Sequence, residues 1–337
     1  MTRTIAMGDP RYFSVRGGAN PHTRNWLGLK KRVNAKLARQ QWHQLARVLL
    51  DHGVDVLVIP PNPKLTGLVY PANAGFLYPL SARDPNKKTA ISNLEKRFYL
   101  SNLVPTRAGE RDVYRSFMSG LGYQTQEICA RFEGEADFFP AGDFMLFTYG
   151  RIEKQRFVLR WGLPPWRRIY GFRSSLEALS ELSAIAKDRP ILPLELILET
   201  HYHGDTALCS FGPQRRFLLA FLEALSEDSR QRLKAAFGEN LIPISRPDGE
   251  LYAANAFPLE HEGRFYLFMP QGVSQELLVQ IRQRGVEPVC VNVSEFMAKG
   301  GGSVKCMILD LGPSDEQPEQ PAARSFREKH RYLNLFG

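Results

Sequence analysis

The chain has 337 residues, and its 44 Lys and Arg against 35 Asp and Glu give a formal net charge of +9. A hydrophobic fraction of 43% and a charged fraction of 23% exclude a mostly disordered or fibrous protein. No apolar stretch approaches the roughly 20 residues that cross a bilayer, and no apolar leader begins the chain, so we expect a cytoplasmic protein without a membrane partner.

A unit of amphipathic helix, turn and short strand recurs along the chain. Its first copy is a helix within residues 31–52, ended by Gly53, and a buried strand at residues 54–59. Four more helix and strand pairs are predicted at 110–119 and 122–128, 175–187 and 191–198, 216–237 and 241–244, and 274–284 and 286–293. Five copies indicate an α/β fold of modules around an axis, although unrelated α/β proteins also alternate helices and strands.

The expected organisation is one domain over residues 1–313 with insertions near 81–97 and 151–168. The segment that follows Pro313 is rich in Pro, Gln and acidic residues, which predicts a disordered basic tail over 314–337. Basic clusters occur along the chain without a nucleic-acid-binding motif, and such clusters usually lie on solvated faces. We therefore do not expect a nucleic-acid partner.

One polar or reactive residue follows each predicted strand at a similar distance. These residues are Asn73, Glu133, His203, Asn255 and Cys306. Two of the segments share letters, Tyr70-Pro-Ala-Asn-Ala74 and Tyr252-Ala-Ala-Asn-Ala256. Strand ends that converge would bring these side chains to one site.

The four cysteines lie far apart and form no C-x-x-C motif, which disfavours a zinc knuckle or a disulfide scaffold. Cys306 follows three glycines and precedes a β-rich run, so it is either a nucleophile held near a cleft or a small buried hydrophobe. Cys129 and Cys290 lie in apolar runs and are expected to be buried, whereas Cys209 fits either interpretation.

The segment Thr200-His-Tyr-His-Gly-Asp-Thr206 places His201, His203 and Asp205 on one face if it is extended. A metal site would need further His ligands that the sequence does not supply, so a Cys/His pair is the favoured interpretation and no metal is expected. Two acidic residues, Glu133 and Asp137, lie close to phenylalanines in the segment 132–139. They are either functional acids or turn residues whose carboxylates point to water.

Five motifs in order resemble the guanidine-modifying enzymes of the pentein fold, which include arginine deiminases, dimethylarginine dimethylaminohydrolases and arginine dihydrolases. They are Met7-Gly-Asp-Pro-Arg-Tyr-Phe13 with Asn20-Pro21, Tyr70-Pro-Ala-Asn-Ala-Gly75, Phe132-Glu-Gly-x-x-Asp137 with Tyr170-Gly-Phe-Arg173, Tyr202-His-x-Asp-Thr206, and Gly300-Gly-Gly-Ser-Val-Lys-Cys306. The resemblance spans roughly residues 7–312 and implies a five-bladed, pseudo-symmetric α/β propeller of ββαβ-type modules.

The resemblance also implies a mechanism. Cys306 as a thiolate would attack the guanidinium carbon, and His203 would protonate the leaving amine and then activate water. Glu133 would hold His203 or the guanidinium, while Asp205, and by the same logic Asp137, would bind the guanidinium.

Arg173 would grip a substrate carboxylate, and Asn20 would belong to the substrate-binding set. Lys305 would help to stabilise the thiolate. Asn73 stands where many relatives have an acid, and as a neutral substrate-binding residue it would allow a second hydrolysis. Arg107 is the nearest substitute for an arginine that relatives place after the next strand.

We therefore expect a cofactor-free hydrolase of arginine or a related guanidino compound that gives citrulline or ornithine. One alternative is an amidinotransferase, in which an amine replaces water. Another is a catalytically silent pentein that binds a cationic ligand or nucleic acid. The sequence leaves the guanidino substrate and any homo-oligomer open.

Overall fold

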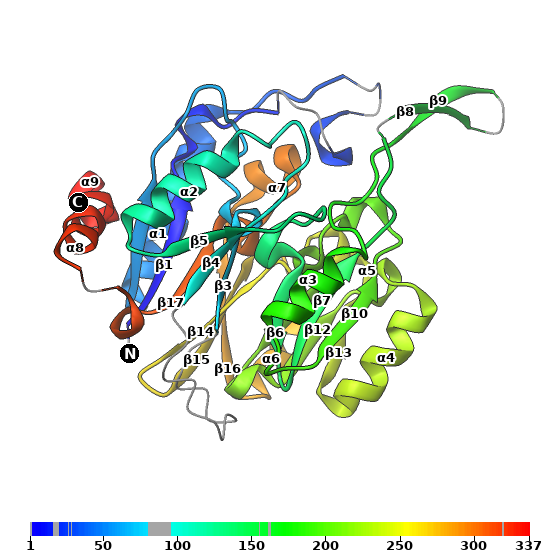
Figure 1. Ribbon diagram of the computed structural model, residues 1–337. Helices are drawn as coiled ribbons and strands as arrows, with labels where there is room; N and C mark the ends of the chain where they lie inside the picture. Colours follow the sequence, from blue (N-terminus) through cyan, green and yellow to red (C-terminus); the bar gives the residue numbers. More distant parts are fainter. Residues whose placement is uncertain are drawn as a thin grey trace.

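The computed structural model describes residues 2–15, 20–25, 27, 29–79, 96–154, 156–160, 163–318 and 320–337, and it gives the backbone alone over 157–160 and 163–167. Within these residues the strands form five three-stranded sheets and one two-stranded sheet (Figure 1). None of the helices described is long and apolar enough to cross a membrane.

The five larger sheets share one pairing pattern, in which the central strand pairs antiparallel with one neighbour and parallel with the other. Their strands are, in sheet order, β17 (Leu309–Pro313), β1 (Arg3–Gly8) and β2 (Val54–Ile59); β3 (Gly75–Tyr78), β4 (Arg97–Leu100) and β5 (Gln124–Glu127); β6 (Phe138–Ala141), β7 (Phe144–Tyr149) and β10 (Ile191–Glu195); β11 (Leu208–Phe211), β12 (Phe217–Ala220) and β13 (Leu241–Pro243); and β14 (Phe257–His261), β15 (Arg264–Pro270) and β16 (Val286–Val291). The α/β class is confirmed, and the five sheets correspond to the five predicted modules. Their arrangement around an axis stays a prediction.

Helices connect and cover these sheets. They are α1 (Ala35–Asp51), α2 (Glu110–Gly120), α3 (Ala178–Ile185), α4 (Glu227–Phe237), α5 (Arg246–Glu250), α6 (Gln275–Arg282) and α7 (Ser294–Gly300). The first begins at Asn34, whose side chain accepts a hydrogen bond from the backbone N–H of Leu37 at 3.1 Å, and Gly53 follows it with φ 77°. Its apolar stripe, which includes Trp42 and Leu45, is fully buried, so packing rather than propensity holds α1 in place.

The predicted helix over 216–237 is wrong in its first part. Residues Phe217–Ala220 form β12, the central strand of its sheet, and the helix starts only at Glu227. A continuous apolar run is compatible with a central strand as well as with a buried helix. Here the run is buried and lies between β11 and β13. Arg215 and Arg216 consequently lie in the β11–β12 turn, at the end of a short 3-10 turn, and not on an α-helix.

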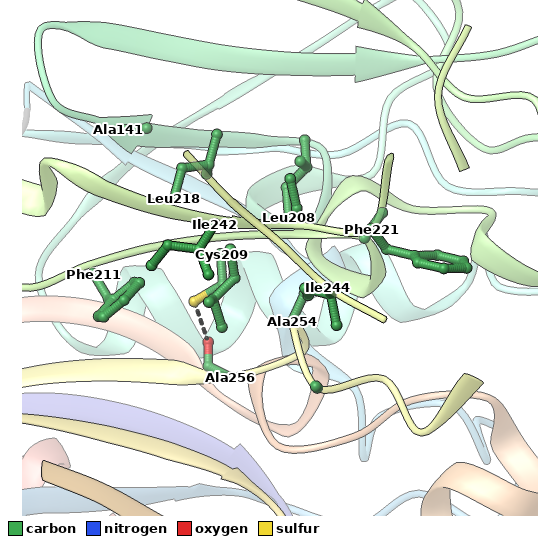
Figure 2. Packing of buried hydrophobic residues seen from close by; sticks show 14 of the residues in the cluster. Ala141, Leu208, Cys209, Phe211, Leu218, Phe221, Ile242, Ile244, Ala254 and Ala256 are labelled. Carbon is green, nitrogen blue, oxygen red and sulfur yellow. Dashed lines mark hydrogen bonds between the residues drawn. The ribbon is translucent and has the colours of Figure 1, made fainter. Parts of the chain in front are cut away.

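The cysteines differ from the sequence prediction. Cys209 is buried in β11, and Figure 2 shows its Sγ directed at the carbonyl oxygen of Ala256, 3.3 Å away, among apolar side chains. Burial raises the pKa of Cys209 to about 12, so this thiol stays neutral. Cys129 and Cys290 are exposed, which corrects the prediction that they are buried. Cys290 lies on an edge strand, where one face of an apolar run can face water.

The expectation of a disordered tail is wrong for residues 321–336. They form α8 (Pro321–His330) and α9 (Tyr332–Phe336), which lie beside α2 and β2 (Figure 1). Tyr332 is buried against Trp42, and its hydroxyl lies 2.8 Å from Nδ1 of His43. An apolar stripe among the basic residues therefore holds this segment on the body, which a reading of charge alone does not reveal.

The two predicted insertions have different outcomes. Residues 80–95, which make up nearly all of the first, lie outside the described part of the chain. The second contains β8 (Arg156–Arg160) and β9 (Leu163–Ile169), an antiparallel hairpin that projects from the body (Figure 1). The proposed domain boundary near 313 stays a prediction.

Replacing Tyr332 by Ala is expected to lower the free energy of unfolding by about 2–4 kcal/mol, because it empties a buried aromatic site between α9 and α1. Chemical denaturation measures the change. The control is Leu333→Ala on the same helix, where a side chain that is 60% exposed should change stability by less than about 0.5 kcal/mol. Equal effects of the two variants would mean that the C-terminal helices do not dock.

Candidate active site

Cys306 lies in a short 3-10 turn between α7 and β17 and is 4% exposed. The glycines before it are needed for close approach. A Cβ on Gly300 would lie 1.8 Å from the hydroxyl oxygen of Tyr70, and a Cβ on Gly302 would lie 2.9 Å from Cβ of Cys306. The backbone therefore packs against Tyr70 in a way that only glycine allows, and this packing fixes the position of the thiol.

Asn255 completes the setting of this thiol, and no role was assigned to it from the sequence. Its Oδ1 accepts hydrogen bonds from the backbone N–H groups of Ser303 at 2.9 Å and Cys306 at 3.1 Å. Its Nδ2 lies 3.1 Å from Sγ of Cys306 and donates to the carbonyl of Asp205 at 3.0 Å. The sequence pointed to its place at the site, through its position after a predicted strand and the letters that residues 252–256 share with residues 70–74, but not to its contact with the thiol.

Asp205 is the acid next to the thiol. Sγ of Cys306 donates to its Oδ2 at 3.2 Å, whereas the buried Oδ1 has no hydrogen-bond partner among the described residues. Burial raises the pKa of Asp205 to about 6. Burial, and then the Asp205 carboxylate, raise the pKa of Cys306 well above its usual range. The sulfur is therefore a neutral thiol beside an acid with one oxygen that has no hydrogen-bond partner among the described residues.

His203 is buried and held between two carboxylates. Its Nδ1 lies 3.0 Å from Oδ2 of Asp137, and its Nε2 lies 3.2 Å from Oε2 of Glu133. Burial alone would lower the pKa of His203, but the two acids outweigh it and raise that pKa to about 9. The reverse holds for Glu133, where His203 overcomes burial and lowers the pKa to about 2. The imidazole is therefore charged at neutral pH.

Asp137 orients His203 and does not line the cavity. Its carboxylate accepts hydrogen bonds from the hydroxyls of Thr148 at 2.7 Å and Ser174 at 2.6 Å, and from the backbone N–H of Gly204 at 2.9 Å. These donors and His203 occupy both oxygens. The expectation that Asp137 binds a guanidinium is therefore corrected, because it acts on the histidine from behind.

Asn73 and Arg107 form the next part of the site. The guanidinium of Arg107 donates to Oδ1 of Asn73 at 3.0 Å and is held by Glu110 at 2.7 Å. Because arginine only donates, the amide oxygen of Asn73 must face Arg107, so its nitrogen faces His203. That Nδ2 lies 3.1 Å from Nε2 of His203 and 3.4 Å from Oε2 of Glu133.

Arg173 and Asn20 lie on another wall. The guanidinium carbon of Arg173 is 5.0 Å from the centroid of the Tyr202 ring, which orients this buried cation. Asn20 donates to the carbonyl of Gly300 at 2.8 Å and to the hydroxyl of Tyr202 at 3.0 Å. Asn20 thus ties the N-terminal segment to the glycine turn as well as facing the cavity.

A cavity of about 380 Å³ joins these groups, and Cys306, His203, Glu133, Asn73, Arg173 and Asn20 all line it together with Arg107. Asp205 lies behind Cys306 rather than on this wall. Segments from four modules and the N-terminal loop therefore meet at one buried space, as the strand-end argument predicted.

Two expected neighbours lie elsewhere. The ammonium of Lys305 is bound to Glu135 at 2.6 Å and so is not placed to stabilise the sulfur of Cys306 directly. His201 is turned to the carbonyl of Gly249 at 3.0 Å. The two 3-10 turns Glu199–His201 and Gly204–Thr206 interrupt the extended segment, so His201 does not share the face of His203.

Comparisons with known proteins identify the family of this chain. The family model for eukaryotic N,N-dimethylarginine dimethylhydrolases matches residues 200–312. An N(G),N(G)-dimethylarginine dimethylaminohydrolase of Mycobacterium tuberculosis is 30% identical over 312 residues, which cover 93% of this chain and 87% of that protein. The bifunctional arginine dihydrolase/ornithine cyclodeaminase AgrE of a Nostoc strain is 26% identical over 90% of this chain, but only 37% of that longer protein is covered.

Solved structures show the same fold. The product-bound N-terminal domain of ArgZ, an arginine dihydrolase from cyanobacteria, has a TM-score of 0.74 at 22% identity over 92% of this chain and 98% of that chain. A dimethylarginine dimethylaminohydrolase adduct with S-methyl-L-thiocitrulline has a TM-score of 0.62 at 18% identity, over 92% and 100% of the two chains. The chain therefore belongs to the dimethylarginine dimethylaminohydrolase family of guanidine-modifying enzymes, which have the pentein fold.

Proposed function

We propose that this protein hydrolyses the guanidino group of arginine or a related compound through a covalent adduct on Cys306. The observation that carries the proposal is that the buried thiol of Cys306 and the charged imidazole of His203, which come from different modules, line one cavity. Next to the thiol, the buried Asp205 has one oxygen without a hydrogen-bond partner among the described residues. A binding module would need the acids but neither the thiol nor the imidazole.

Binding of the substrate cation activates the nucleophile. A guanidinium bound against Glu133, next to Cys306 and the Asp205 behind it, brings a positive charge close to the thiol, which favours the thiolate, and the thiol proton passes to solvent. Arg173, which lines another wall of the cavity, pairs with a substrate carboxylate in this proposal.

The chemistry then runs in two halves. The thiolate of Cys306 forms a C–S bond to the guanidinium carbon, His203 gives its proton to the leaving nitrogen, and the C–N bond breaks to release ammonia or an amine. The neutral His203 next takes a proton from water, whose oxygen bonds to the carbon. Collapse breaks the C–S bond, returns the thiolate and leaves a urea group, and the remaining hydroxyl proton goes to solvent.

Replacing Cys306 by Ser is expected to lower ammonia release at least about 10³-fold, because a hydroxyl of high pKa replaces the thiolate nucleophile. Ammonia or amine release is measured with arginine, asymmetric dimethylarginine and agmatine, which differ in methylation and in the carboxylate. Cys290→Ser, at an exposed thiol, is the matched control and should keep wild-type rates. Release of neither ammonia nor amine by the wild type from any of the three would contradict the proposal.

The acid step should appear in the pH profile of kcat/KM, which reports the enzyme before substrate binds. Because His203 must carry its proton, kcat/KM is expected to fall as pH rises through about 9. Asp137→Asn removes a carboxylate that stabilises the charged imidazole, so the descending limb should move to lower pH. Glu135→Gln, a buried acid in the same turn that does not contact His203, should leave the limb in place. An unshifted limb in Asp137→Asn would argue against His203 as the acid.

Asn73 supports a second candidate activity, in which citrulline is hydrolysed again to ornithine, carbon dioxide and ammonia. The amide nitrogen that Arg107 turns toward His203 favours an unprotonated Nε2, whereas Glu133 favours the protonated one. Nε2 of His203 thus has Glu133 as a neighbour that stabilises its protonated form and Asn73 as a neighbour that stabilises its unprotonated form. Because Asn73 is neutral, it does not oppose the unprotonated imidazole, which is the form that activates water to attack a urea carbon.

Exhaustive turnover of arginine tests this second step. The wild type is expected to give ornithine and two ammonia per arginine, measured by amino-acid analysis. Asn73→Asp should give mainly citrulline, because a third carboxylate beside His203 stabilises the protonated imidazole. Citrulline as the sole product of the wild type would remove the second hydrolysis and leave the first intact.

A further inference from the structure

A second cavity of about 90 Å³ lies apart from the catalytic one, and none of the residues that line it lines the catalytic cavity. One side is apolar, with Phe76, Phe138 and Phe257 among its residues. The other side carries charged groups from β1, the β11–β12 turn, β17 and the segments that precede β4, β6 and β17. They are Arg3, Lys96, Glu135, Arg215, Lys305 and Asp310.

The charges around this cavity do not balance. Arg3 binds Asp310 through two contacts of 2.7 and 2.5 Å, Lys305 binds Glu135 at 2.6 Å, and Lys96 binds Glu316 outside the cavity at 2.5 Å. These three pairs leave the guanidinium of Arg215 as the surplus cation.

Arg215 has one distant partner. Its guanidinium lies 3.7 Å from Oδ2 of Asp310, an oxygen that Arg3 already holds, and its side chain makes no hydrogen bond to the described part of the chain. Burial, and then the positive charge of Arg3, lower the pKa of Arg215, which fits a cation that lacks compensation. Its side chain is 25% exposed, so solvent reaches part of it.

The backbone holds Arg215 at the cavity at a cost. Gln214 and Arg215 have φ of 54° and 56°, the left-handed region that side chains with a Cβ disfavour. The carbonyl of Arg215 accepts a hydrogen bond from the N–H of Gly142 at 2.9 Å, which fixes this turn. The next residue, Arg216, has an ordinary φ of −73° and lies exposed against the ring of Phe217.

We propose that this cavity binds a small carboxylate with a short apolar chain. The carboxylate pairs with Arg215 and supplies the missing negative charge, while the chain lies against the phenyl rings. The volume exceeds that of two water molecules, about 30 Å³ each, and suits an acid of the size of propionate. An inorganic anion would satisfy the charge but would leave the apolar wall uncovered.

The test is a thermal unfolding titration of the full chain with sodium propionate at constant ionic strength, with sodium chloride as the balancing salt. A saturable rise in Tm is expected, because a ligand that binds only the folded state stabilises it. Propylammonium chloride, a cation of similar shape, should give no rise. A rise no larger than that of chloride alone would overturn the proposal.

Two variants locate the site. Arg215→Asn removes the cation while keeping a residue that tolerates left-handed φ, and it should weaken propionate binding at least tenfold. Arg216→Asn removes a neighbouring charge outside the cavity and should change the affinity less than twofold. If Arg215→Asn does not fold, Arg215→Lys serves instead, and it should bind several-fold more weakly because an ammonium does not form the paired contact. Equal affinity in the wild type and the Arg215 variant would refute the site.

A further arm separates the two cavities, since Arg173 in the catalytic one also suits carboxylates. In Cys306→Ser, saturating arginine should leave the affinity for propionate unchanged. Displacement of propionate by arginine would assign its binding to the catalytic cavity and overturn the inference, whether or not the protein hydrolyses arginine.

Discussion

The structure of this site depends on one buried charge, the imidazolium of His203 between Asp137 and Glu133. An isolated ion in a protein interior is costly, and His203 or Glu133 would lose its charge if it were buried alone. Together His203 and Glu133 stay ionised, because a pair of opposite charges about 4 Å apart is worth about 4 kcal/mol at an effective dielectric near 20. The opposite pKa shifts of His203 and Glu133 are two views of that attraction.

The charges on the other side of the site, around the sulfur of Cys306, are not balanced in this way. Cys306 is buried against the Asp205 carboxylate, and no cationic side chain of the described residues contacts either group, so the thiol keeps its proton. One oxygen of Asp205 has no hydrogen-bond partner among the described residues. In the proposed mechanism, a cationic substrate supplies the positive charge. This account explains why a chain of net charge +9 can favour a cation, since the acids at contact distance act far more strongly than a surface charge that salt screens.

Much of the architecture could be predicted from the sequence. Val54–Ile59 has the bounds expected of it, and α1 lies within its predicted range, because both have clear periodicity and a glycine between them. The 217–220 strand and the docked C-terminal helices could not be predicted, because each depends on a surface built from distant segments. A strand is central only when β11 and β13 lie on its two sides, and an amphipathic tail is ordered only when α1 offers Trp42 and His43 to it.

The sequence by itself determined the chemical inventory of the site, because Cys306, His203, the acids and the glycines are residue types at positions that folding does not alter. Only the tertiary structure decided how that inventory is used. It turned Asp137 to the back of His203, Lys305 toward Glu135, and Asn255 onto the sulfur. The direction of a side chain depends on the turn that carries it and on neighbours from other modules, and neither is written in the local order of residues.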